Sequence, residues 1–226
     1  MFEQTDLFVR GIGEATDVIS KEMFRVISGG NLEKVFAGEK IKSKANLSLR
    51  PEGTAGVVRA VIQNGMVPQG SAPAKLMYAG PMFRGERPAA GRQRQFMQVG
   101  VECIGASSPT IDAEAIIMLL RFYESLGFKL EDLSLVINSM GCPNCRSKYR
   151  DAMIAFLDKC ADKLCQTCHE RKDTNPLRVL DCKCDDCQKI LSEAPKISDF
   201  LCDDCRSHND QVEKMLKIAD INFSRD

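Results

Sequence analysis

Apolar and polar positions along the chain follow two patterns, the two-residue spacing of strands and the longer spacing of helices. Both patterns occur in the first part of the chain, and the helical one predominates afterwards. Two extended patterns, over residues 75–84 and 94–104, flank a stretch rich in glycine, proline and alanine. This arrangement predicts an antiparallel hairpin with a long tip, and a kink at Gly80-Pro81. Other segments with extended patterns are residues 42–49, 133–138 and 221–224. Helical patterns cover residues 6–27, with a break near Gly11 and Gly13, and residues 55–64, 110–126, 146–158 and 211–218.

The second strand of the predicted hairpin has two faces of different character. Successive side chains of a strand point to opposite faces. One face carries Phe96, Gln98, Gly100 and Glu102, and the other carries Met97, Val99, Val101 and Cys103. We expect the second face to pack into the core and the first to form the floor of a polar pocket. A first face that is simply open to solvent is the alternative.

Charged side chains gather in the loop between the two strands. Glu86 lies among Arg84, Arg87, Arg92 and Arg94. A guanidinium group can bind phosphate or carboxylate through two parallel hydrogen bonds. The loop could therefore hold a polyphosphate, or it could be a solvated, salt-bridged loop like most charged stretches.

Thr54, before the helix over residues 55–64, is a good helix cap, and Gly65 suits the end of that helix.

Overall composition is that of an ordinary globular chain. Of its 226 residues, 44% are hydrophobic and 27% charged, with 31 basic and 31 acidic side chains. Such a neutral balance means that any RNA contact must use a local patch, and it fits equally well with no nucleic-acid partner. The apolar stretches are too short for a membrane span, and the N-terminus lacks the pattern of a signal peptide. We expect a cytoplasmic protein with no membrane contact.

Cysteine content changes abruptly along the chain. Of eleven cysteines, only Cys103 precedes residue 140, and the other ten lie from Cys142 to Cys205. This shift predicts a first domain over residues 1–139 and a cysteine-rich helical domain over residues 140–220. Residues 221–226 would then begin a return to the first domain. In a cytoplasmic chain, cysteines are more often thiols or metal ligands than disulfides.

Eight of these cysteines form CxxC pairs, the usual half-site of a tetrahedral zinc centre. The pairs are Cys142 with Cys145, Cys165 with Cys168, Cys184 with Cys187, and Cys202 with Cys205. Two pairs make one site, so the pattern predicts up to two structural Zn²⁺ ions. His169 and His208 are possible substitute ligands, and Cys182 is left over. Reduced free thiols without metal are the alternative.

Several segments resemble those of one enzyme family. Residues 83–88 (Phe-Arg-Gly-Glu-Arg-Pro) and 91–96 (Gly-Arg-Gln-Arg-Gln-Phe) are similar to the second signature motif of class II aminoacyl-tRNA synthetases. Residues 98–102 resemble the version specific to histidine, and residues 49–54 a segment that contacts the amino acid. Residues 21–23 and 175–178 also fit. The resemblance to histidyl-tRNA synthetases runs from about Phe2 to the C-terminus.

The resemblance implies an α+β fold, a partial class II catalytic core built on antiparallel sheet, with a small helical cysteine-rich insertion domain. Members of the family activate histidine with ATP and Mg²⁺ to histidyl-adenylate. They then transfer the histidyl group to the 3′ end of tRNA-His. The family also implies a homodimer for the full-length enzyme. The insertion domain packs over the tRNA acceptor stem, where basic side chains could meet the RNA backbone: Lys148, Arg150, Arg171, Lys172 and Arg178.

Family roles carry over to matching positions. Arg84 corresponds to the catalytic arginine that bridges the α-phosphate and the amino-acid carboxylate. Glu86 and Arg92, with Arg84, correspond to ATP-binding residues of the hairpin loop. The positions that correspond to the histidine pocket are Glu52, Gly53, Thr54, Arg84, Gln98 and Glu102.

The chain departs from the family pattern at Met97, Gln93 and Ala89, where histidine, tyrosine and glutamine are common. Met97 falls on the expected core face, so we expect a packing change there. The first signature motif should precede Phe2, and the third, with a second histidine-specific segment, should follow Asp226. We therefore expect a fragment with little or no activity of its own.

Two other functions stay open at this point. One is a regulatory paralogue of histidine biosynthesis, a synthetase-like subunit that partners ATP phosphoribosyltransferase and lacks ligase activity. The other is a zinc-binding RNA module formed by residues 140–220. Retention of Glu52, Arg84, Gln98 and Glu102 favours the ligase over the paralogue.

Overall fold

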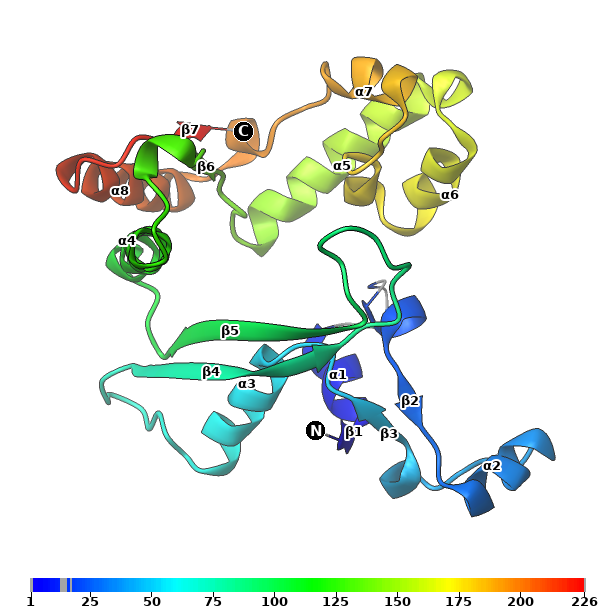
Figure 1. The fold of residues 1–226 in the computed structure, drawn as a ribbon. Helices are drawn as coiled ribbons and strands as arrows, with labels where there is room; N and C mark the ends of the chain where they lie inside the picture. Colours follow the sequence, from blue (N-terminus) through cyan, green and yellow to red (C-terminus); the bar gives the residue numbers. More distant parts are fainter. Residues whose placement is uncertain (1, 13–15, 17, 226) are drawn as a thin grey trace. The chain divides into compact units, whose positions relative to one another are not determined.

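The chain is described by a computed structural model over residues 2–12, 16 and 18–225. It divides into two compact units, Met1–Ala106 and Ser107–Asp226 (Figure 1). This division falls earlier than residue 139, where the cysteine content had suggested a boundary. The reason is that the helix after Ser107 packs with the last helix of the chain. Its Ala113 shares a core with Val212 and Leu216.

The first unit combines a small sheet, a long hairpin and three helices. Its strands are β1 (Phe2–Gln4), β2 (Arg25–Val26), β3 (Leu47–Leu49), β4 (Ala74–Phe83) and β5 (Gln95–Ile104). Its helices are α1 (Thr5–Ile12), α2 (Gly29–Phe36) and α3 (Thr54–Gln63), with a π-helical turn at Val18–Glu22 and a 3-10 turn at Ser43–Ala45. Strand β3 lies between β1 and β2, antiparallel to both, while β4 and β5 form a separate two-stranded antiparallel sheet.

The helix expected over residues 6–27 is confirmed over α1 and is wrong at Arg25–Val26, which form β2. After α1 comes the π-helical turn, and β2 then pairs with β3, with Arg25 opposite Ser48. Pairing with a distant strand overrides the local helical pattern, as tertiary context often does. Gly13, where a break was expected, lies outside the described residues.

Strands β4 and β5 confirm the predicted hairpin to within one residue at every end. Their register runs from Ala74 opposite Ile104 to Phe83 opposite Gln95. The kink expected at Gly80-Pro81 does not interrupt β4, which pairs continuously through both residues. The long antiparallel hairpin and the helices against it agree with the expected α+β class.

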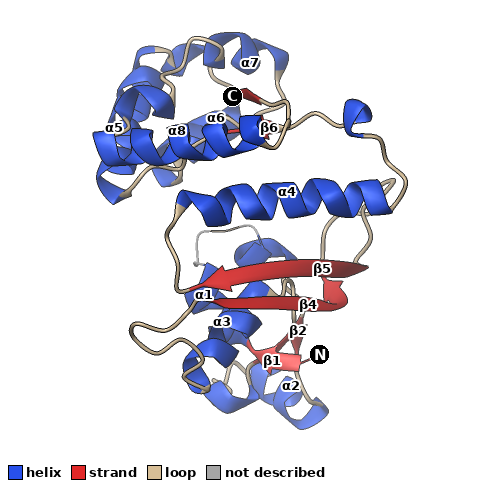
Figure 2. Cartoon of the chain, turned by 90° about the vertical axis from the view of Figure 1, so that its left-hand side faces the viewer, coloured by secondary structure: helices blue, strands red, loops and turns tan. Residues whose placement is uncertain are grey.

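The face of β5 that was expected to pack into the core is exposed, and the face that was expected to form a pocket floor is partly covered. Met97, Val99 and Val101 are 69%, 57% and 47% exposed in the described structure, so the prediction that they pack into a core is wrong. Gln98 and Glu102 on the opposite face are half-buried. Helix α3 lies against the hairpin (Figure 2), and Thr54 of α3 donates to Glu102, so α3 covers this face. Met97 therefore points away from the predicted pocket floor.

The second unit is mainly helical. Its elements are α4 (Pro109–Ser125), β6 (Val136–Ile137), α5 (Pro143–Lys159), α6 (Gln166–Thr174), α7 (Asp185–Leu191), α8 (Asp203–Ile218) and β7 (Ser224–Arg225). Strands β6 and β7 are short and parallel. Sequence patterns predicted α4, α5 and the end of α8, but not α6 or α7. In the part of the chain that the structure describes, no helix is long and apolar enough to cross a membrane.

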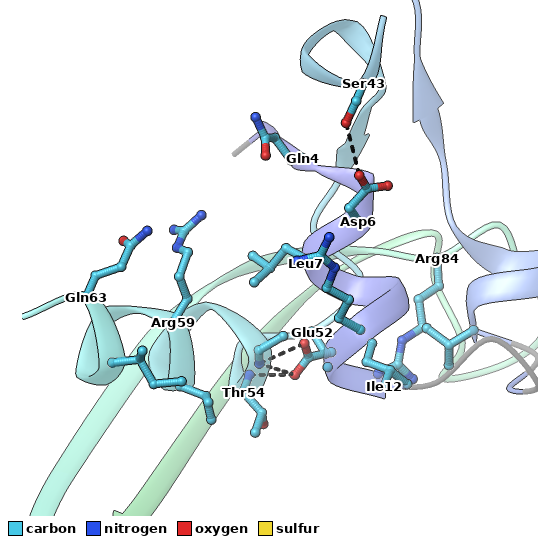
Figure 3. Close-up of a pocket in the computed structure, with 16 residues that line it drawn as sticks. Gln4, Asp6, Leu7, Ile12, Ser43, Glu52, Thr54, Arg59, Gln63 and Arg84 are labelled. Carbon is cyan, nitrogen blue, oxygen red and sulfur yellow. Dashed lines mark hydrogen bonds between the residues drawn. The ribbon is translucent and has the colours of Figure 1, made fainter. Parts of the chain in front are cut away.

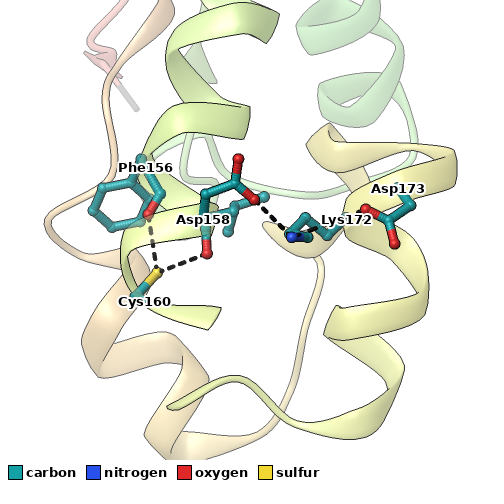
Figure 4. Close-up of polar contacts among 6 residues, drawn as sticks. Phe156, Asp158, Cys160, Lys172 and Asp173 are labelled. Atoms are coloured by element: carbon teal, nitrogen blue, oxygen red, sulfur yellow. Dashed lines mark hydrogen bonds and ion pairs between the residues drawn. The ribbon is translucent and has the colours of Figure 1, made fainter. Parts of the chain in front are cut away.

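Two separate cores support this unit. One joins α4 and α8 through Ala113, Val212 and Leu216. The other lies among α5, α6 and α7, where Met153 and Leu157 are fully buried. Its cysteine members are Cys168, Cys182 and Cys187. At its edge, Lys172 of α6 donates to Asp158 of α5 at 2.6 Å (Figure 4).

A buried acid fixes the C-terminal strand to α8. The Arg225 guanidinium donates to the Glu213 carboxylate at 2.6 and 2.5 Å and holds the pKa of that carboxyl below its usual value. A lowered pKa stabilises the fold above the unfolded pKa, about 4.3 for glutamate, and the contribution disappears as pH falls through the folded pKa. Because the Arg225 side chain is 65% exposed, we expect Glu213→Gln to cost only about 1 kcal/mol at pH 7.

Urea unfolding at several pH values tests this contribution. The difference between wild type and Glu213→Gln should begin to shrink near pH 4.3 and vanish in stronger acid, since the other titrating groups are common to both proteins. Glu131→Gln is the control, because the Glu131 side chain is 73% exposed and should leave stability unchanged. A Glu213→Gln difference that is the same at pH 7 and pH 3 would contradict the assignment.

Candidate functional site

The N-terminus of α3 is organised by two acidic side chains. The Glu52 carboxylate accepts hydrogen bonds from the backbone N–H groups of Thr54 and Ala55, at 2.5 and 3.0 Å (Figure 3). The Thr54 hydroxyl donates to Glu102 of β5 at 2.7 Å. Thr54 was expected to cap the helix, but Gly53 holds the N-cap position and the Glu52 side chain provides the cap. Glu52, Thr54 and Glu102 thus form one connected group.

Arg84, just after β4, is tied to the same segment. Its Nε donates to the carbonyl oxygen of Pro51 at 2.9 Å, and its guanidinium lies over the Phe96 ring, 5.2 Å from the ring centre. The Phe83 N–H donates to the Arg50 carbonyl at 2.9 Å, and Arg50 Nε donates back to Pro81 at 2.8 Å. These contacts hold the end of the hairpin against the residues that precede α3.

The hairpin loop adds an ion cluster around Glu86. Its carboxylate lies 2.9 Å from Arg92 Nε and 3.9 Å from a terminal nitrogen of Arg84. The Glu86 side chain is 17% exposed, while that of Arg92 is 66% exposed. The structure therefore brings together the three residues expected to contact ATP, with the acid largely buried and Arg92 largely exposed.

A pocket of about 1210 Å³ opens beside this group and is lined by residues of α1 and α3 (Figure 3). Of the expected site residues, Glu52, Thr54 and Arg84 line the pocket, whereas Gln98 and Glu102 of β5 are not among its lining residues. Among the described residues, the buried Oε1 atom of Gln98 has no hydrogen-bond partner. Leaving a buried acceptor without a donor costs free energy.

Sequence reasoning did not find several polar residues of this pocket. Asp6, Arg10 and Arg59 line it from α1 and α3. Asp6 accepts from the Ser43 hydroxyl at 3.0 Å, and Arg59 pairs with Glu3. No local motif marks these residues, because their convergence depends on how two helices pack.

The ring of Tyr78 explains why Gly53 and Gly100 carry no side chain. A Cβ atom added to Gly100 would lie 2.2 Å from the Tyr78 ring, and one added to Gly53 would lie 2.3 Å from it. Tyr78 and Gly100 are direct partners across the hairpin. The ring thus occupies the space that the two missing side chains leave, and it forms part of the face that had been expected to floor a pocket.

We expect Gly100→Ala to destabilise the first unit by about 1 to 3 kcal/mol, because a rigid ring held between two backbones cannot move aside. Urea unfolding followed by circular dichroism measures the change. Gly56→Ala in α3 is the matched control, since a Cβ at Gly56 meets nothing within 4 Å and alanine favours a helix by up to about 1 kcal/mol. Equal effects of the two substitutions would show that Tyr78 does not restrict the site.

Eight of the eleven cysteines gather in two groups of four within the second unit. One group consists of Cys142, Cys145, Cys202 and Cys205, and the other of Cys165, Cys168, Cys182 and Cys187. The Sγ atoms of each group all lie within 4.8 Å of one another, so each could hold a metal ion. The first group joins two of the four predicted CxxC pairs, a combination that the sequence analysis had left open. In the second, Cys182 stands where Cys184 had been expected.

Neither histidine joins these groups. His208 Nε2 lies 2.7 Å from an Asp112 carboxylate oxygen. Burial raises the pKa of the Cys187 thiol to about 11, whereas the Cys168 backbone N–H lowers the pKa of Cys165 to about 7. The sulfur atoms of one group thus differ in how readily they lose a proton.

A family comparison agrees with the geometry of the hairpin and its neighbours. Residues 22–176 match the family model described as histidyl-tRNA synthetase. The chain is 45% identical over 223 residues to a histidine–tRNA ligase of Clostridioides difficile and 46% identical over 226 residues to one of Thermosipho melanesiensis. These matches cover 99% and 100% of this chain, and 49% and 50% of the relatives.

The fold comparison gives the same result. The crystal structure of apo Staphylococcus aureus histidyl-tRNA synthetase matches all of this chain and 46% of its own, with a TM-score of 0.68 and 34% identity. The α+β core with its hairpin is therefore that of a class II aminoacyl-tRNA synthetase. The chain belongs to the histidyl-tRNA synthetase family. It spans about half the length of the curated relatives that it matches.

Proposed function

We propose that this chain forms part of a histidine–tRNA ligase, in which it provides contacts to histidine and ATP. The observation that carries the proposal is the attachment of Arg84 to the backbone beside Glu52. The Pro51 carbonyl holds Arg84 at 2.9 Å, and the Glu52 carboxylate caps α3 from the next position in the chain. A cation and a carboxylate group, each fixed by hydrogen bonds to the backbone, thus line the same pocket.

This charge pattern is complementary to a free amino acid. The Arg84 guanidinium suits the carboxylate of histidine and, in the reaction, the α-phosphate that this carboxylate attacks. Glu52 and the Thr54–Glu102 pair suit the ammonium group. Fixed charges of this kind lower the barrier by aligning the two anions and by stabilising the charge that develops on the phosphate.

We assign the remaining parts of the two substrates to three further residues. The unpartnered Oε1 of Gln98 suits an imidazole N–H of histidine. Glu86 and Arg92 would meet ATP, with Arg92 turning from Glu86 towards the polyphosphate. Mg²⁺ would accompany ATP and neutralise part of its charge.

The proposal includes further partners. The histidyl group would pass to tRNA-His, in the cytoplasm, where protein synthesis uses it, and the complete enzyme would be a homodimer. Of the basic residues considered for RNA, Lys148 and Arg150 are exposed on α5. Lys172 instead pairs with Asp158, and Arg171 donates to the Arg178 carbonyl. Zinc at the cysteine groups would have a structural role and take no part in either chemical step.

The proposal predicts selective binding of the reaction intermediate. Isothermal titration of the chain with a non-hydrolysable sulfamoyl analogue of histidyl-adenylate should show at least about tenfold tighter binding than the alanyl analogue, because Gln98 would bind the imidazole. Folded chain that does not distinguish the two analogues would overturn the histidine assignment. The regulatory paralogue is not favoured, because Glu52, Arg84 and Glu102 are all present and grouped.

A further inference from the structure

We propose that the second unit binds two Zn²⁺ ions, each through four cysteine thiolates, with Cys182 and not Cys184 completing the second site. We further infer that the two ions differ in how readily they are released. The first site consists of Cys142, Cys145, Cys202 and Cys205, and the second of Cys165, Cys168, Cys182 and Cys187.

Sulfur spacing supports four-coordinate sites. Four thiolates about 2.3 Å from a tetrahedral Zn²⁺ lie about 3.8 Å from one another. The Sγ atoms of Cys165 and Cys182 are 3.8 Å apart, and those of Cys142 and Cys145 are 3.4 Å apart. Both distances far exceed the length of about 2.05 Å for a disulfide bond. All eleven cysteines are free thiols.

Backbone N–H groups point at the sulfur atoms across each site. The Cys202 N–H donates to Cys145 Sγ at 3.1 Å in the first site, and the Cys165 N–H donates to Cys187 Sγ at 3.3 Å in the second. Such donors favour a thiolate, the form that binds metal. The same residues, Cys202 and Cys165, hold the N-cap positions of α8 and α6. There the helix dipole also favours negative charge.

Cys182 provides a sulfur ligand of the second site, whereas the nearby Cys184 contributes only its backbone N–H. Cys184 presents its backbone N–H, which donates to Cys182 Sγ at 3.4 Å. It thereby supports the ligand sulfur from outside the group of four. Cys160 is also separate, because its thiol lies 3.2 Å from the Phe156 carbonyl oxygen and can donate to it (Figure 4). The second site therefore uses a CxxC pair with a Cx₄C pair, a combination that CxxC spacing alone does not reveal.

Burial makes the two sites unequal. In the second site Cys168 and Cys187 are fully buried, Cys182 is 6% exposed, and all three belong to the core that contains Met153 and Leu157. In the first site Cys202 is exposed, and Cys142 and Cys205 are half-buried. A chelator or an oxidant can therefore reach the first ion, where only Cys145 is buried, more readily than the second, where only Cys165 is half-buried and the other three cysteines are buried in the core.

The first ion would also connect the two cores of the second unit. Cys142 and Cys145 lie at the start of α5, which belongs to one core, and Cys202 and Cys205 lie at the start of α8, which belongs to the other. Four thiolates favour zinc or iron among common metals, and oxygen-binding ions such as Mg²⁺ are disfavoured.

Metal analysis of the chain, purified under reducing conditions without chelator, is the first test. Two zinc ions per chain are expected. Cys182→Ser should retain one, whereas Cys184→Ser, the matched control, should retain two. Zinc-free folded wild type, or loss of an ion from Cys184→Ser with none from Cys182→Ser, would overturn the ligand assignment. Two iron ions in place of zinc would overturn the choice of metal.

Release kinetics form the second test. With excess chelator and a colorimetric zinc indicator, wild type should release its ions in two equal phases that differ roughly tenfold or more in rate. Cys202→Ser should lack the fast phase only. If Cys182→Ser does not fold, X-ray absorption of Cys184→Ser decides, with four sulfur neighbours at about 2.3 Å from each ion expected. A single release phase, or oxygen and nitrogen neighbours, would contradict the proposal. None of these measurements requires histidine or ATP, so their outcome is independent of the ligase assignment.

Discussion

Replacing Arg84 with alanine is expected to weaken binding of the histidyl-adenylate analogue by about 100-fold, the usual scale for losing a positioned cation at a charged reaction centre. The substitution removes the guanidinium that, in the proposed site, would face the phosphate, and with it the 2.9 Å hydrogen bond to the Pro51 carbonyl. Arg84→Lys should recover only part of the loss, because an ammonium cannot make two parallel hydrogen bonds. Isothermal titration of each variant measures the effect.

Arg87→Ala is the control for general loss of positive charge in the loop. Arg87 is exposed and lies three positions from Arg84, so its removal should change affinity by less than about threefold. Unfolding curves of both variants should match that of wild type within about 1 kcal/mol. If Arg87→Ala weakens binding as much as Arg84→Ala, the loop acts as a diffuse positive surface, and Arg84 has no special place in the site.

Leu157→Ala is expected to destabilise the second unit by about 3 kcal/mol, since removing a buried leucine side chain leaves a cavity. Leu157 is 0% exposed and packs in the core that contains Met153, Val179 and three cysteines of the second group. The substitution should also disturb that group, because the same side chains hold its sulfur atoms. Urea unfolding followed by circular dichroism gives the change in free energy.

Leu180→Ala provides the comparison within the same unit. Leu180 is 43% exposed, so the same chemical change should cost less than about 1 kcal/mol. Similar losses for the two substitutions would mean that the core around Leu157 is loosely packed. A selective loss at Leu157 accompanied by faster zinc release would link packing and metal binding directly.

The hairpin shows how far sequence patterns could predict this fold. Alternation located β4 and β5 to within one residue, because strands with a long loop between them leave a clear signal. Alternation separates two faces but does not say which one is covered. The apolar face of Met97 and Val99 is exposed, while α3 covers the polar one. Which face of β5 is covered depends on the packing of a helix from elsewhere in the chain.

For the candidate sites too, sequence motifs identified some residues but not how the fold brings them together. Family motifs marked Glu52 as a substrate contact, but its role as the cap of α3 depends on a backbone geometry that propensity does not reveal. CxxC spacing correctly grouped Cys142 with Cys145 as neighbours. It could not identify Cys182, because that thiol reaches its group through the fold of the chain between α6 and α7.

The first metal ion proposed above, which would join the start of α5 to the start of α8, would also affect the unfolded chain. Cys145 and Cys202 are 57 positions apart, and an ion that holds both would close a ring containing α6 and α7. Closing a ring of this length removes conformational entropy worth about 4 kcal/mol from an unfolded chain that keeps the cross-link. Metal at this one exposed site would therefore stabilise helices with which it makes no contact.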